Sequence, residues 1–194
     1  MAKNIITVNI DQVVKGLDEK KKNSELVLKR TVGDMRSRAP GWISKAVREE
    51  YNISAKDVKA ALKTGNDGTI SIGGTVVDNV TLTYSGRVLT PTHFKMKPTS
   101  RPSSNKGYNV TAEIKKGARK SLGSHVFLAG SGGSGSTQIP FKRKGQSRLP
   151  IEAVKTLSIP QMIQSGEGTK PRIEQAINEG LEKRFKHYCD QYLR

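Results

Sequence analysis

The chain has 194 residues, of which 34% are hydrophobic and 5% aromatic, so it is long enough for one good core or at most two small ones. Its single cysteine, Cys189, excludes an intrachain disulfide, and no apolar run approaches the roughly 18 residues that span a membrane. The formal net charge of +17 attracts nucleic acid or an acidic protein face. The opening MAKNIITVNI is too short in apolar length for a secretory signal, so we expect a protein made and used without export.

The first third of the chain, residues 1–64, is predicted to be mainly helical after a short alternating strand over residues 5–10. Apolar residues at helical spacing indicate helical stretches over residues 11–38, 42–51 and 55–62. The polar stretch from Glu19 to Ser24 is either a break between two helices or an exposed turn of one helix. Pro40 and Gly41 are expected to end the first, since proline removes a helical hydrogen bond. Ser54 and Asp57 match a capping box for the third. The residues that begin this third helix are a poor set for base edges, which disfavours a DNA-reading helix-turn-helix.

Residues 65–145 are predicted to be rich in β-strands joined by basic loops. Alternating or β-branched stretches indicate strands over residues 69–72, 80–84, 87–89, 94–96, 108–114, 125–128 and 138–142. Glycine-containing turns are expected at residues 66–68, 73–74 and 85–86. The Gly/Ser run from Gly130 to Ser136 lacks the Lys-Ser/Thr ending of a phosphate-binding loop and predicts a hairpin tip instead.

Positive charge is concentrated in this middle region. Between Gly86 and Arg148 there are thirteen basic residues and one acid, Glu113, a balance of +12. Such a segment predicts an interface or a DNA-facing surface, and a solvated basic surface without a specific partner is the alternative. The candidate contact residues are Lys115, Lys116, Arg119, Lys120, Lys142, Arg143, Lys144 and Arg148.

A basic RNA- or DNA-binding protein of housekeeping type is the main rival interpretation. Lysines and arginines in loops neutralise phosphates, and exposed aromatic rings stack on bases. The basic segment contains four aromatic residues, Phe94, Tyr108, Phe127 and Phe141. All four lie in strand patterns that indicate the core. The basic charge expected of a nucleic-acid-binding protein is therefore present, but exposed aromatic rings that could contact bases are not predicted.

The sequence gives no sign of an enzyme. The three histidines, His93, His125 and His187, are scattered, and acidic residues are sparse across the predicted β region. No strand carries the paired carboxylates of a metal-dependent nuclease, and one thiol with three distant histidines makes a zinc site improbable. We expect no catalytic residue, no metal and no cofactor.

Residues 146–194 combine a turn-rich segment with a helix over residues 169–192, whose apolar residues recur at steps of three and four. The whole chain is therefore predicted to be a single α+β domain, with a mainly antiparallel sheet flanked by N-terminal helices and the long C-terminal helix. The segment PFKRKGQSRLPIEAVKTLSIPQM contains an aromatic-x-Arg strand, a basic turn and a hydroxyl-hydrophobe-Pro-x-Met motif. These residues are Phe141, Arg143, Arg148, Pro150, Ile151, Ser158, Pro160 and Met162. The segment resembles the C-terminal signature of the phage minor tail protein Z family, the tail-completion proteins of long-tailed phages.

The resemblance implies a structural virion protein of the tail or neck, assembled in the host cytoplasm as a homo-oligomer, most simply a hexameric ring. It would join the head-proximal end of the tail tube, or the tail terminator protein, to the head-tail connector protein around genomic DNA in the channel. Within the signature, Pro150 and Pro160 are expected to fix two turns, Ile151 and Met162 to be buried, and Ser158 to cap a short helix.

Overall fold

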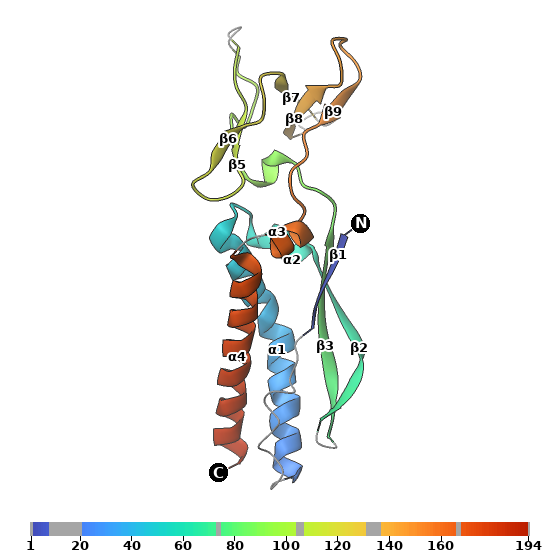
Figure 1. Cartoon of the computed structure of the whole chain (residues 1–194), viewed down its shortest axis with the longest axis vertical. Helices are drawn as coiled ribbons and strands as arrows, with labels where there is room; N and C mark the ends of the chain where they lie inside the picture. Colours follow the sequence, from blue (N-terminus) through green and yellow to red (C-terminus); the bar gives the residue numbers. More distant parts are fainter. Residues whose placement is uncertain are drawn as a thin grey trace.

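The computed structural model describes residues 2–7, 21–72, 75–103, 107–130, 137–165 and 168–193. The α+β class is confirmed (Figure 1). The helices are α1 (Lys21–Glu50), α2 (Ala55–Ala60), α3 (Ile159–Ser165) and α4 (Thr169–Tyr192). The strands are β1 (Ala2–Thr7), β2 (Leu62–Ile72), β3 (Thr75–Gly86), β4 (Lys95–Lys97), β5 (Thr111–Glu113), β6 (Arg119–Ser121), β7 (Val126–Gly130), β8 (Gln138–Arg143) and β9 (Ile151–Ala153). All recorded pairing is antiparallel, and the strands form three three-stranded sheets rather than one.

The molecule is elongated and has two parts (Figure 1). The body consists of the four helices and the sheet β1-β3-β2, with α1 and α4 lying side by side along it. The head consists of the sheets β4-β5-β6 and β7-β8-β9. Each part has its own hydrophobic cluster. The interpretation of residues 1–194 as one domain stays a prediction.

The predicted helix break at Pro40 is wrong, because α1 runs without interruption from Lys21 to Glu50. Proline removes one helical hydrogen bond, but the residues around it lie in the body core. Ala39 and Ile43 are fully buried, and α1 packs against both α4 and β3. The burial of this face outweighs the lost hydrogen bond. The expected helical residues 11–20 lie outside the described residues.

The body sheet differs from the predicted strands at two places. The expected turn at residues 66–68 lies inside β2, which pairs with β3 over its length and shifts register between Asn66 and Thr69. A bulge of this kind absorbs extra residues without ending the ladder. The strand expected at residues 5–10 is β1, over residues 2–7, paired with the end of β3. The turn expected at residues 73–74 lies outside the described residues.

Ser54 caps the start of α2 as predicted, with Asp57 as its partner. The Ser54 hydroxyl accepts a hydrogen bond from the Asp57 N–H (3.0 Å) and donates one to the Asp57 carboxylate (2.6 Å). The helix then ends at Ala60 rather than near Leu62, because Leu62 already pairs with Tyr84 in the body sheet. Tyr84 is 1% exposed, and its burial raises the pKa of its hydroxyl to about 12.

The strands of the head differ from the predicted ones, since β6 and β9 are not among the predicted strands and one predicted strand does not form. Residues 119–121 form β6, although their charged sequence RKS was expected to be a loop. Residues 87–89, predicted as a strand, form no named strand. The N–H of Leu89 instead donates to the Leu157 carbonyl (3.2 Å), and the Thr156 N–H donates to the Leu89 carbonyl (2.8 Å). These bonds join the two chain segments that connect body and head.

Candidate functional site

The two head sheets share one small core. Met96 and Val110 from the first sheet and its flank cluster with Val126 and Leu128 of β7. Because side chains alternate along a strand, residues between these positions lie on the opposite faces of the two sheets. The head therefore has two outer faces, and they differ in chemistry.

The charged face, the outer face of β4-β5-β6, presents Lys95, Lys97, Glu113 and Arg119. Arg119 Nη2 lies 3.2 Å from Glu113 Oε2, and Arg119 Nη1 donates to the Lys95 carbonyl (3.2 Å). Hydrogen bonds from the Gly117 N–H and then from the Asn52 side chain, with the nearby cations, lower the pKa of the Glu113 carboxyl. Arg119 is thus an internal partner in this face as well as a predicted contact residue.

Lys115 lies at the junction of head and body. Its ammonium is 2.8 Å from a Glu50 carboxylate oxygen and 5.7 Å from the centre of the Tyr51 ring. Thr169, at the start of α4, donates a hydrogen bond to the same carboxylate. Desolvation raises the pKa of Glu50, but the bonds from Lys115 and Thr169 outweigh it and lower the pKa overall. Lys115 therefore ties the head to α1 and α4.

The other six predicted contact residues are exposed and form no ion pair with a described residue. They are Lys116, Lys120, Lys142, Arg143, Lys144 and Arg148. Lys142 and Arg143 end β8, and Lys144 and Arg148 belong to the turn between β8 and β9, which the Lys144 N–H closes by donating to the Pro150 carbonyl (3.1 Å). The structure thus gathers the basic part of the signature at one end of the head.

The prediction that Ile151 is buried is wrong, because its side chain is 36% exposed. Ile151 lies in the edge strand β9 and pairs with Arg143 of β8. Because side chains alternate along a strand, Ile151 lies on the outer face of the sheet, away from the head core. Leu149 beside it is 67% exposed. Pro150, which was expected to fix this turn, is exposed between them. The basic turn therefore also presents apolar side chains to solvent.

The aromatic face, the outer face of β7-β8-β9, presents Phe127, Phe141, Arg143 and Ile151. The two phenylalanines lie directly opposite one another, with ring centres 6.3 Å apart and planes at 29°. The Arg143 guanidinium lies 5.7 Å from the Phe127 ring centre. Both rings are partly exposed, and neither belongs to a hydrophobic cluster of the described residues.

The interpretation of all four aromatic residues of the basic segment as core is therefore wrong for two of them. Phe94 is buried in the body core, and Tyr108 packs on the head core with its hydroxyl accepting the Leu128 N–H (2.8 Å). Phe127 stands between the inward-pointing Val126 and Leu128, so it points outward. An unbroken apolar run such as VFLA hides which alternate residues face the core.

A groove of about 770 Å³ lies beside the aromatic face. Its lining includes the cations Arg101 and Arg143, the imidazole of His125 and the Phe127 ring. The Arg101 N–H donates to the Gln138 side-chain carbonyl (2.6 Å). This bond holds the segment around Arg101 against the start of β8. The groove therefore places Arg101, from a segment distant in the sequence, near the Phe127 ring.

The last part of the signature is built into the body as predicted. Ser158 precedes α3 and hydrogen-bonds Gln161, while its carbonyl accepts the Met162 N–H (3.0 Å). Pro160 lies in the first turn, where its missing N–H is tolerated. Met162 is fully buried in the body cluster. The cap and the burial of Met162 are confirmed.

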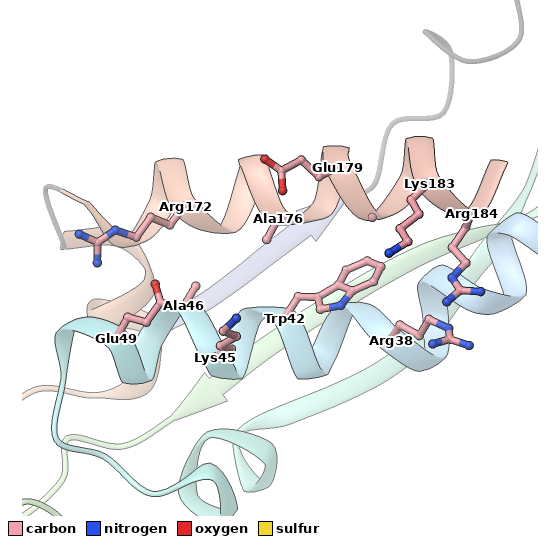
Figure 2. A pocket seen from close by; sticks show the side chains of 11 residues that line it. Arg38, Trp42, Lys45, Ala46, Glu49, Arg172, Ala176, Glu179, Lys183 and Arg184 are labelled. Carbon is pink, nitrogen blue, oxygen red and sulfur yellow. The ribbon is translucent and has the colours of Figure 1, made fainter. Parts of the chain in front are cut away.

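A second groove, of about 380 Å³, lies between α1 and α4 (Figure 2). Its residues include Arg38, Lys45, Arg172 and Lys183, with the Trp42 ring between the two helices. A Cβ on Gly180 would stand 2.2 Å from the Trp42 ring, so glycine is what lets the ring lie against α4. This groove is a packing feature of the helix pair.

The described residues hold no arrangement that points to catalysis. His93 Nδ1 lies 3.1 Å from an Asp57 carboxylate oxygen, but the nearby Ser54 hydroxyl donates to that carboxylate and not to the imidazole. A nucleophile needs its base as the hydrogen-bond partner. No group of three potential metal ligands was found among these residues. In the same part of the chain, no helix has the length and apolar character to cross a membrane.

Comparison with known proteins gives no relative. None of the models of protein families, the curated proteins or the solved structures that were compared matches the chain.

Proposed function

We propose that the chain is a structural virion protein, a tail-completion or neck subunit that joins the tail tube to the head connector around the DNA channel. The observation that carries this proposal is the exposure of Leu149 and Ile151 within the segment that resembles the tail-completion signature. Apolar residues on an exposed basic turn are suited to burial against a neighbouring subunit. The rest of that signature, from Ser158 to Met162, anchors the same segment in the body.

The charge of the head supports an acidic neighbour for such a ring. Lys142, Lys144 and Arg148 are exposed in the same segment as the apolar residues and form no ion pair with a described residue. Six copies of the chain would carry roughly +100, which opposes assembly unless an acidic surface compensates it. Genomic DNA in the channel or an acidic face of the tail or connector ring would supply that compensation.

A basic nucleic-acid-binding protein of housekeeping type is the second candidate, and the aromatic face favours it. Partly exposed rings beside cations provide the base-contacting group that the sequence did not indicate. The two candidates differ in what they bury: subunit assembly buries Leu149, whereas nucleic acid covers the rings and the cations. Ile151 lies on the same face as the rings, so Leu149 is the residue that separates the candidates.

The test is the solution mass of the purified protein, measured by light scattering at low and high salt with and without nuclease. A nuclease-insensitive oligomer that Leu149→Asp and Ile151→Asp reduce to monomer supports the neck role. Val88→Asp is the matched control, because Val88 is 42% exposed but lies outside the signature. A monomer that carries RNA and loses it steeply with salt would replace the neck role with the second candidate.

A further inference from the structure

We propose that the aromatic face is a stacking platform for single-stranded nucleic acid. The inference goes beyond the neck role and does not depend on it, because a single head is sufficient to bind a short strand. It rests on Phe127, Phe141 and Arg143 with the cations around them, and not on the exposed apolar residues Leu149 and Ile151.

The ring pair has the geometry of a stacking surface. Phe127 and Phe141 are cross-strand partners on the same face of the β7–β8 hairpin, and the inclination of their planes is only 29°. Val126 and Leu128, on either side of Phe127, belong to the head core, whereas neither phenylalanine does. Every base has a flat π-face, and such rings bind successive bases with little dependence on sequence.

Cations on the face and beside it are placed to contact the phosphates. Arg143 lies over the Phe127 ring, and Arg101 lines the groove beside it. Lys144 and Arg148 extend the charge beyond β8. The one acidic residue in this sheet, Glu152, pairs with Lys142. Side chains alternate along a strand, so Glu152 and Lys142 lie on the face of the sheet opposite to the two rings. Negative charge therefore lies off the ring face, and a strand that stacks there meets cations along its backbone.

Single-stranded nucleic acid fits this face better than duplex or acidic polypeptide. The bases of a duplex are stacked on each other, so their faces cannot reach a ring pair on a sheet. An acidic polypeptide would satisfy the cations but has no regular array of flat rings for the two phenylalanines. The charged face provides an internal comparison, because Lys95, Lys97 and Arg119 present positive charge there without a ring.

The test is fluorescence anisotropy of a labelled oligothymidylate of about 12 nucleotides, within the span of a small single-strand-binding fold. We expect Phe127→Ala and Phe141→Ala each to weaken binding about 5-fold to 150-fold, the range for loss of one base–aromatic stack. Phe141→Leu keeps apolar volume without a π-face and should also weaken binding. Lys97→Gln, on the charged face, removes one cation and should change the affinity only about 2-fold.

A second measurement detects stacking directly, with a variant that keeps an aromatic ring at position 127. In Phe127→Trp, the new indole should be quenched when oligothymidylate binds, while Trp42, in the groove between α1 and α4, should keep its emission. Far-UV circular dichroism confirms that each variant is folded.

Three results would overturn the inference. The first is equal affinity of wild type and both alanine variants for the oligonucleotide. The second is equal affinity for the single strand and for a duplex of the same length, which indicates phosphate contact alone. The third is tighter binding of polyglutamate, with the same loss in the alanine variants, which assigns the face to an acidic polypeptide. None of these results bears on whether Leu149 and Ile151 mediate assembly.

Discussion

The body and the head of this protein bury their apolar residues to very different extents. The body cluster contains twenty-one buried residues of the described chain, most of them in α1 to α4 and β3, whereas the head cluster contains four. The body fully buries large side chains such as Tyr51, Tyr84 and Met35. The head leaves phenylalanine, leucine and isoleucine side chains partly or largely exposed. The body is therefore the more extensively buried part of the molecule, and both proposed contact surfaces lie on the head.

The largest expected effect tests the claim that the body carries the stability. Met162 is fully buried among body residues, so Met162→Ala should lower the free energy of unfolding by about 2–5 kcal/mol in urea titration. Leu149→Ala in the head, at a side chain that is 67% exposed, should change it by less than about 0.5 kcal/mol. Equal losses in the two variants would remove this distinction between body and head.

The next effect tests the contact between the two long helices. In Gly180→Ala the new methyl group meets the Trp42 ring, which must move, and we expect a loss of about 1–3 kcal/mol in thermal or urea unfolding. Gly33→Ala in α1 has nothing within 4 Å of the new Cβ and should be neutral or stabilise by up to about 1 kcal/mol. If Gly180→Ala behaved like Gly33→Ala, the packing of Trp42 on α4 would not matter to stability.

The smallest effect concerns the junction, where Glu50 binds Lys115 of the head and Thr169 of α4. Because its pKa is lowered in the folded protein, its stabilisation is present above the ordinary value of 4.5 and is lost as the pH falls through the lowered value. Glu50→Gln should cost roughly 1–2 kcal/mol at neutral pH and weaken the acid dependence below about pH 5. The exposed neighbour in Glu49→Gln is the matched control. An unchanged acid profile in Glu50→Gln would show that this carboxylate does not secure the junction.

Sequence patterns predicted the parts of the fold whose signals are local. The apolar stripe gave α4 its bounds, Ser54 and Ser158 marked helix starts, and Met162 was expected in the core. Where the sequence prediction was wrong, burial against other elements of the fold determined the structure. The packing of α1 against α4 and β3 carries the helix through Pro40.

The candidate site was only half predicted, for a similar reason. Charge is visible in composition, so the basic turn at Lys142 to Arg148 was found. Which face of β7 points inward depends on the partner sheet, and the apolar run around Phe127 contains no polar residue to mark the solvent side. The exposure of the Phe127–Phe141 pair and of Ile151 thus became visible only with the sheet pairing.

Native-state amide hydrogen exchange tests the division between body and head most directly. We predict that amides in α1, α4 and β3 exchange only through global unfolding, while amides in β5, β7 and β8 exchange through openings of lower free energy, because the head core is small. Equal protection of head strands and body helices would contradict the account.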